Sequence, residues 1–153
     1  DFVGEFGLLY DQPRNASLKS FRNVELLRID YSEIVSLSEL DPNIDDIRKE
    51  IYRTVGIRMA DNWLRFDPGY SQLDHLGRLD FIRSLPVQTL KEGSQEKQVT
   101  PSRCILMEGS VEIGESVYTA PDQFFVRAES TLQAMDSTSI MLIPRADVEK
   151  GLL

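Results

Sequence analysis

The chain has 153 residues, of which 41% are hydrophobic, so one ordinary domain or two small ones with packed cores are expected. Its net charge of −8 argues against nucleic acid as a partner, because affinity for phosphates comes largely from Lys and Arg. The sequence contains no run of 18 apolar residues and therefore predicts no membrane span. Its start shows neither an initiator Met nor a signal peptide, so we expect a fragment of a longer protein.

The first 17 residues concentrate the groups that could bind a ligand. Gly4 and Gly7 allow the backbone to approach a ligand closely. A short apolar turn over residues 6–10 could direct its N-terminal amides at an anion. Arg14 follows a turn Pro and offers a bidentate fork for phosphate, while Glu5 is an acceptor suited to a sugar hydroxyl.

Ser17 adds a small donor and acceptor on the same loop. An acceptor, backbone amides and a guanidinium on one loop suit a ribose-phosphate. The structural alternative is that Arg14 pairs with a carboxylate and Glu5 caps the turn.

The next elements are a strand and two helices. Residues 24–29 predict a strand after a turn at Asn23. Asp41-Pro42 suits an N-cap followed by Pro at the first helical position, and this helix is expected to run to about Leu64. A second helix is predicted over residues 71–84. The apolar residues on one face of the first helix are Ile47, Ile51, Val55, Met59 and Trp63. They form either a core face or the face of a signalling helix that moves against a β-roll.

From Pro86 onwards the pattern changes to short strands punctuated by Gly and by Pro121-Asp122. The predicted strands cover residues 87–90, 104–107, 111–113 and 139–143. Another helix is expected to begin within residues 144–153.

Two stretches of the chain align without gaps, 114 positions apart. Residues 29–34 match residues 143–148, Leu26-Leu27 matches Ile140-Met141, and Leu18 matches Leu132. A repeat this long indicates a duplicated domain. At the same offset Glu5 corresponds to Thr119 and Arg14 to Ala128, so the second copy is expected to lack the chemistry of the first.

The motif resembles the phosphate-binding cassette of cyclic-nucleotide-binding domains. The matching residues are Gly4, Glu5, Leu8, Pro13, Arg14, Ala16 and Ser17. The resemblance implies a β-roll that binds cAMP or cGMP, with Glu5 on the ribose 2′-hydroxyl and Arg14 on the cyclic phosphate. Gly4, Phe6, Gly7 and Ala16 would line the phosphate turn. Asn15 departs from the small residue usual there, and Ser17 lies where a hydroxyl favours guanine.

The resemblance also predicts a mixed α+β fold in three parts. Residues 1–40 would be the C-terminal half of a cyclic-nucleotide-binding-type β-roll and residues 41–85 a helical connector. Residues 86–153 would be a second, degenerate, jelly-roll-like β-roll, since residues 103–113 resemble the family's strand-Glu-Gly-strand pattern but no cassette follows. The strands that should precede the cassette are absent. The expected partner is therefore the rest of the polypeptide or another chain that completes the first roll, and a homodimer is one candidate.

We accordingly expect a regulatory module and not an enzyme. His75 is the single histidine and Cys104 the single cysteine, so a zinc site would lack ligands. A catalytic triad would depend on His75, which has no nucleophile motif nearby. His75 is expected on a helix surface and Cys104 buried in a strand. The arrangement is similar to the cytosolic tail of plant-type plasma-membrane sodium/proton antiporters, which implies a cytoplasmic module that contacts a membrane transport domain. The alternatives are a soluble tandem regulatory subunit of the kinase-regulator type and a non-binding β-roll used for assembly.

Overall fold

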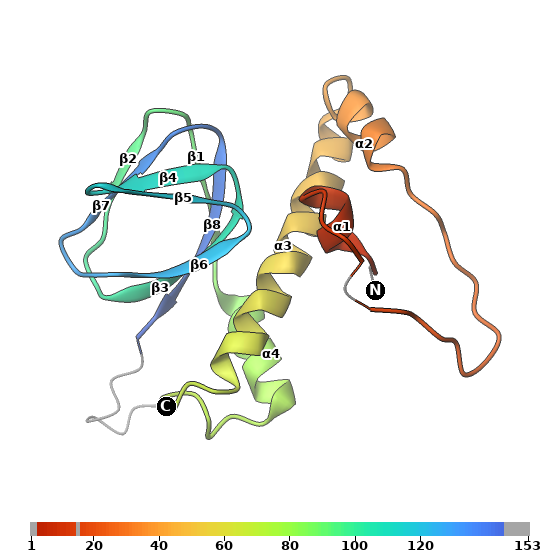
Figure 1. The fold of residues 1–153 in the computed structure, drawn as a ribbon, viewed down its shortest axis with the longest axis horizontal. Helices are drawn as coiled ribbons and strands as arrows, with labels where there is room; N and C mark the ends of the chain where they lie inside the picture. The colour runs from red at the N-terminus through yellow and green to blue at the C-terminus, as the bar shows by residue number, and fades with distance from the viewer. Residues whose placement is uncertain (1–2, 15, 146–153) are drawn as a thin grey trace. The chain divides into compact units, whose positions relative to one another are not determined.

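The computed structural model describes residues 3–14 and 16–145 (Figure 1). The chain divides into two compact units, residues 1–54 and residues 55–153, which we call the N-terminal and C-terminal units. Helix α3, Pro42–Leu64, belongs to both, because the boundary falls within it. The predicted mixed α+β fold class is confirmed, whereas the predicted three-part division of the chain stays a prediction.

Four helices and eight strands lie in the described part of the chain. The helices are α1 (Glu5–Leu9), α2 (Tyr31–Ser38), α3 (Pro42–Leu64) and α4 (His75–Ser84). The strands are β1 (Val87–Leu90), β2 (Gln95–Lys97), β3 (Ser102–Glu108), β4 (Ser110–Ile113), β5 (Ser116–Thr119), β6 (Asp122–Val126), β7 (Thr131–Ala134) and β8 (Thr138–Pro144). None of the described helices combines the length and apolarity needed to cross a membrane.

Short polar side chains begin α2 and α3, whereas α1 begins at Gly4 without a side-chain cap. Asp30 precedes α2, and its Oδ1 accepts hydrogen bonds from the Ser32 hydroxyl at 2.8 Å and the Ser32 amide at 3.0 Å. These two bonds hold the pKa of Asp30 below its usual value. Asp41 accepts a bond from the Asn43 amide at 2.9 Å, so the predicted start of the long helix is confirmed.

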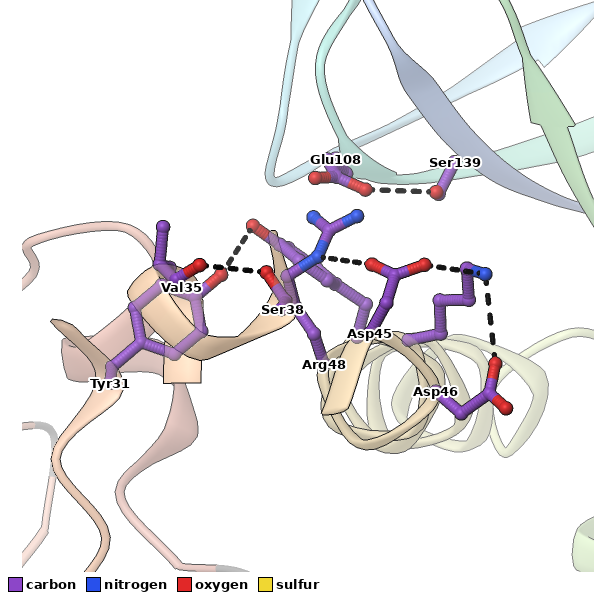
Figure 2. Close-up of polar contacts among 10 residues, drawn as sticks. Tyr31, Val35, Ser38, Asp45, Asp46, Arg48, Glu108 and Ser139 are labelled. Carbon is purple, nitrogen blue, oxygen red and sulfur yellow. Dashed lines mark hydrogen bonds and ion pairs between the residues drawn. The ribbon is translucent and has the colours of Figure 1, made fainter. Parts of the chain in front are cut away.

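The first turns of α3 carry a small ion-pair network. Asp45 accepts a hydrogen bond from Arg48 Nε at 3.0 Å and pairs with Lys49 Nζ at 2.6 Å (Figure 2). The bond from Lys49 and the bond from Arg48 outweigh partial burial and lower the pKa of Asp45. Such pairs, three and four residues apart on a helix, stabilise its exposed face modestly.

The strand predicted for residues 24–29 is wrong for this structure, because no strand is present between residues 16 and 30. A β-strand requires a neighbour for its backbone donors and acceptors. No other described segment of the N-terminal unit is a strand, so the apolar alternation of residues 24–29 has no sheet to join.

The C-terminal unit is a roll of two antiparallel sheets that face each other (Figure 1). One sheet has the order β1-β8-β3-β6 and the other the order β2-β7-β4-β5. The predicted β-roll over the C-terminal residues is confirmed, and all four strands predicted there fall within β1, β3, β4 and β8. That it is the second of two rolls stays a prediction. The four strands that were not predicted are β2, β5, β6 and β7.

Strand β3 is buried on both of its faces, which explains its continuous apolar run. Cys104 and Leu106 point into the core between the two sheets, together with Ile140 of β8. Ile105 and Met107 alternate with them and are also fully buried. The predicted burial of Cys104 in a strand is confirmed.

Residues 55–64 of α3 cover the outer face of the first sheet. A Cβ at Gly56 would lie 3.1 Å from Met107 Cγ and 3.6 Å from Met141 Cε, so the helix approaches β3 and β8 closely here. Further along the helix, the Trp63 ring lies 4.0 Å from the guanidinium of Arg103, which also lies 4.5 Å from the Phe125 ring. Burial lowers the pKa of Arg103, and the cation is stabilised instead by the two aromatic faces.

A buried carboxylate joins α3 to α4. Asp61 accepts a bond from Arg78 Nε at 3.0 Å and one from Arg65 Nη2 at 3.2 Å. Burial alone would raise the pKa of Asp61, but the bonds from the two arginines outweigh it and lower the pKa. The helix predicted over residues 71–84 starts later, at His75, because Asp74 caps it by accepting the Gly77 amide at 2.7 Å. His75 is 64% exposed at this helix start, as expected.

Gly109→Ala is expected to destabilise the C-terminal unit far more than Gly93→Ala. Both glycines have a positive φ, 78° and 74° respectively. A Cβ at Gly93 would meet nothing within 4 Å, whereas at Gly109 it would lie 2.5 Å from the Ser137 carbonyl oxygen. Gly93→Ala should cost about 1 kcal/mol and Gly109→Ala roughly 3 kcal/mol. Native-state hydrogen exchange of the β3 and β8 amides measures the free energy of unfolding of each variant. An equal loss of this free energy in the two variants would contradict the expectation.

Asp61→Asn is expected to lower the free energy of unfolding by about 2 kcal/mol at neutral pH, since bonds to charged groups are lost. Because the pKa of Asp61 is lowered in the folded state, its contribution is present above the unfolded pKa of about 3.9 and is lost as the pH falls below it. The difference between the two proteins should therefore shrink below about pH 4. Urea denaturation followed by circular dichroism at pH 7 and pH 3 measures this. The control is Asp80→Asn, an exposed carboxylate expected to change stability by less than about 0.5 kcal/mol.

Candidate functional site

A cleft of about 750 Å³ lies within the N-terminal unit. It falls in the size range of small-molecule sites. The cassette residues Gly4, Glu5 and Arg14 line it, together with Val3 and Leu8. The structure thus brings together the acceptor, the glycine turn and the guanidinium that the sequence suggested for a ribose-phosphate.

Arg14 folds back onto the glycine turn. Its Nη1 donates a hydrogen bond to the Gly4 carbonyl oxygen. Gly4 has φ 85°, a conformation that glycine adopts without strain. A Cβ on Gly7 would lie 2.8 Å from the Gln12 carbonyl oxygen and 3.2 Å from Arg14 Nη1. The room that the glycines leave is therefore occupied by Arg14 and by the backbone of Gln12.

Glu5 is the first residue of α1 and only 5% exposed, although it lines the cleft. Aromatic side chains hold this helix in place. The Phe6 ring packs on the Tyr10 ring with centroids 5.6 Å apart, and Tyr10 meets Tyr52 of α3 at 6.4 Å. The Tyr31 hydroxyl donates to the Tyr52 hydroxyl at 3.2 Å, so α2 is tied to the same point (Figure 2).

The other predicted site residues lie elsewhere. Phe6 is half-buried against Tyr10, and neither Phe6 nor Gly7 lines the cleft. Ala16 and Ser17 are exposed and contribute nothing to the cleft lining. Asn15 lies outside the described residues. The structure therefore assembles the Gly-Glu and Arg parts of the motif but not its Ala-Ser end.

One wall of the cleft was not anticipated from the sequence. It is formed by the extended residues 25–30 and by Ile47 and Ile51 of α3. Arg28 adds a second guanidinium, and its charge contributes to the lowered pKa of Asp30, after the two bonds from Ser32. The sequence contained one signal of this wall. Glu25 and Arg28 interrupt the apolar run of residues 24–29, which we interpreted only as a strand and not as part of a binding site.

In the C-terminal roll, the positions 114 residues after Glu5 and Arg14 carry neither a carboxylate nor a guanidinium. Thr119, the counterpart of Glu5, lies at the end of β5, where its hydroxyl is 3.3 Å from the Ser110 hydroxyl. Ala128, the counterpart of Arg14, is exposed beyond β6. Inside this roll the Tyr118 and Phe124 rings stack at 3.9 Å. Across residues 3–14 and 16–145, no group of three His, Cys, Asp or Glu side chains is placed to hold a metal ion.

No protein-family model matches the chain, and no curated protein is similar to it. Solved structures are similar over parts of it. The regulatory subunit of a cAMP-independent protein kinase A from Trypanosoma brucei is 16% identical, with a TM-score of 0.40 over 63% of this chain and 42% of that one. The C-linker/CNBHD of zELK channels is 10% identical, with a TM-score of 0.39 over 53% of this chain and 55% of that one.

A third similar structure is CooA, a CO-dependent transcription factor from Carboxydothermus hydrogenoformans, which is 15% identical with a TM-score of 0.37. This match covers 54% of this chain and 39% of CooA. The chain spans less than two thirds of the length of each of the three structures. Their descriptions name a kinase regulatory subunit, a channel domain and a transcription factor. Similarity at this level does not assign the chain to a family.

The thiol of Cys104 is expected to be inert in the folded chain. Burial, aided by the carboxylate of Asp122, raises its pKa to about 12. Since the thiolate is the reactive form, a disulfide reagent such as DTNB at pH 8 should react at least about 1,000-fold more slowly with folded than with urea-unfolded protein. Rapid stoichiometric reaction of the folded chain would show that β3 is not buried as described.

Proposed function

We propose that this chain is part of a cytosolic regulatory module and that its N-terminal unit binds a cyclic nucleotide, cAMP or cGMP. The observation that carries the proposal is the meeting of Glu5, Gly4 and Arg14 in one cleft. In this role Arg14 holds the cyclic phosphate and Glu5 accepts a bond from the ribose hydroxyl. The apolar wall, with Leu26, Ile29 and Ile51, offers a surface for the base.

The bond from Arg14 to the Gly4 carbonyl bears directly on this proposal. A guanidinium has five N–H donors, more than a single carbonyl can accept, so a phosphate can share the group or take it over. Bidentate pairing with phosphate is also stronger than a bond to a neutral carbonyl. Binding would therefore draw Arg14 away from the glycine turn and reshape the cleft.

The regulated partner that we propose is an ion transporter or channel, with the module on its cytosolic face, as in the antiporter tails that the arrangement resembles. Helix α3 supports such a coupling. It lines the cleft through Ile47 and Ile51 and continues without a break into the C-terminal unit, where Val55 and Leu64 are fully buried. In this proposal a ligand that shifts the first half of the helix acts on the second half, and such coupling requires that the helix has two alternative positions.

A second candidate, a non-binding roll used for assembly, is favoured by one observation. The bond from Arg14 to Gly4 and the close packing of Gly7 on Gln12 give the cassette a structural role without any ligand. A soluble kinase-regulator subunit with two working cassettes has less support, because the counterparts of Glu5 and Arg14 are Thr119 and Ala128.

Calorimetric titration with cAMP and cGMP tests the proposal. We expect saturable binding that Arg14→Ala weakens by at least about 10-fold, since a charge-assisted bond contributes about 1.5–3 kcal/mol. The control is Arg22→Ala, which removes the same charge from an exposed position outside the cleft lining and should leave affinity unchanged. Absence of heat up to millimolar nucleotide would favour the assembly role, and an equal loss in both variants would exclude Arg14 as a specific contact.

A further inference from the structure

The guanidinium of Arg103 is held in place by aromatic rings and not by an anion. The Trp63 ring lies 4.0 Å from it and the Phe125 ring 4.5 Å. Its Nε is buried and has no hydrogen-bond partner, whereas its two terminal nitrogens reach the surface. In the described part of the chain, no carboxylate pairs with this cation. The rings stabilise the charge but leave the N–H donors without an oxygen acceptor, so the group is suited to a carboxylate.

Strand β6 has an open edge next to this cation. It is the last strand of the sheet β1-β8-β3-β6 (Figure 1), and no described strand lies on the side away from β3. The Gln123 amide donates to the Asp122 carboxylate at 2.7 Å, so it points away from β3. Because N–H groups point alternately to the two sides of a strand, the N–H and C=O of Phe125 also lie on the open side. Such an edge is a template for pairing with an extended peptide.

The cation and the open edge belong to one surface. Arg103 and Phe125 are directly opposite in the antiparallel register of β3 and β6, so their side chains share one face of the sheet. The guanidinium lies beside the Phe125 ring and therefore extends from β3 toward the open edge. Phe125 is 53% exposed, whereas its neighbours Phe124 and Val126 point into the core. We call the backbone of residues 123–125 with these two side chains the β6 edge site.

We infer that the β6 edge site binds an extended acidic peptide of a partner protein by strand addition. The added strand lies about 4.8 Å beyond β6 and bonds to the N–H and C=O of Phe125. A Glu or Asp opposite Phe125 has its Cβ about 5 Å from that of Phe125, within reach of the Arg103 guanidinium. The residues on either side of it face the same way as Phe124 and Val126, so apolar side chains suit them.

The expected recognition pattern is thus apolar-acidic-apolar, and local charge selects it. The net charge of −8 repels an acidic peptide at long range. At physiological ionic strength, however, exposed charges are screened beyond about 8 Å, whereas a carboxylate bonded to Arg103 touches the cation. This inference does not depend on whether the N-terminal cleft binds a nucleotide.

Fluorescence anisotropy with two matched peptides tests the inference on residues 1–153. The probe is the fluorescein-labelled peptide Lys-Thr-Val-Glu-Val-Thr-Lys, and the second peptide has Gln in place of Glu. We expect the Glu peptide to bind at least about 10-fold more tightly, since its carboxylate adds a charge-assisted bond. Arg103→Gln should remove this difference. The matched control, Lys97→Gln, removes one charge from β2 in the other sheet and should leave the difference unchanged.

Gln123→Pro tests the backbone contribution separately. A proline on the open side of an edge strand blocks strand addition there, while the bonds to β3 remain. Both peptides should therefore bind at least about 10-fold more weakly to this variant. Two-dimensional NMR of the isotope-labelled chain locates the bound peptide through shifts of the β6 amides. Slow hydrogen exchange of the β8 amides shows that each variant is folded.

Three results would overturn the inference. The first is equal affinity for the Glu and Gln peptides, or no saturable binding of either up to millimolar concentration. The second is a preference for Glu that persists in Arg103→Gln. The third is a set of amide shifts confined to β1, β2 or β5, which would place the peptide at another edge. If Arg103→Gln does not fold, the comparison of the two peptides on the unsubstituted chain still decides.

Discussion

A β-strand lasts only where its backbone donors and acceptors find partners, and this requirement separates residues 24–30 from strand β8, whose sequence is similar. In the C-terminal unit β8 is paired on both edges, and the roll is organised around it. Its residues fill the core between the sheets and also meet the helix that covers the outer face. In the N-terminal unit a segment of similar sequence has no neighbour, and its leucines stay in solvent.

The cleft depends on this difference, because residues 25–30 form one of its walls. An unpaired extended segment is less rigid than a strand held on both edges, since few buried contacts restrain it. The opposite wall is firmer. There α1 is held to α3 through Tyr10 and Tyr52, and the glycine turn is closed by Arg14. α1 and the glycine turn are thus restrained by ring packing and by a hydrogen bond, whereas residues 25–30 are not held in a sheet.

The sequence was most informative where local signals are strong. The start of α3 followed from Asp41-Pro42, and the buried strands followed from apolar runs such as residues 104–107. Strands β2 and β5 were missed because they are short and mostly exposed, so neither has an alternating pattern. The strand at residues 24–29 was predicted from a pattern that is correct for a strand, but pairing is a tertiary property that the pattern does not contain.

The candidate site was also predictable only in the part that depends on local sequence. Glu5 and Arg14 are only nine positions apart in the sequence, so their meeting in a cleft is a local event. Arg28 and Ile47 reach the cleft only through the path of the chain between α1 and α3, which no short motif specifies. The bond from Arg14 to the Gly4 carbonyl was also not foreseen, because the glycines were expected to leave room for a ligand.

The contact between Trp63 and Arg103 has a practical consequence. Trp63 is the single tryptophan of the chain, and its indole lies under the guanidinium of Arg103 and edge-on to the Phe125 ring. Indole fluorescence depends on nearby charge and on access of water, so the emission of this one residue reports how the end of α3 sits on the first sheet. The chain therefore contains its own optical reporter for the C-terminal unit, and no dye needs to be attached.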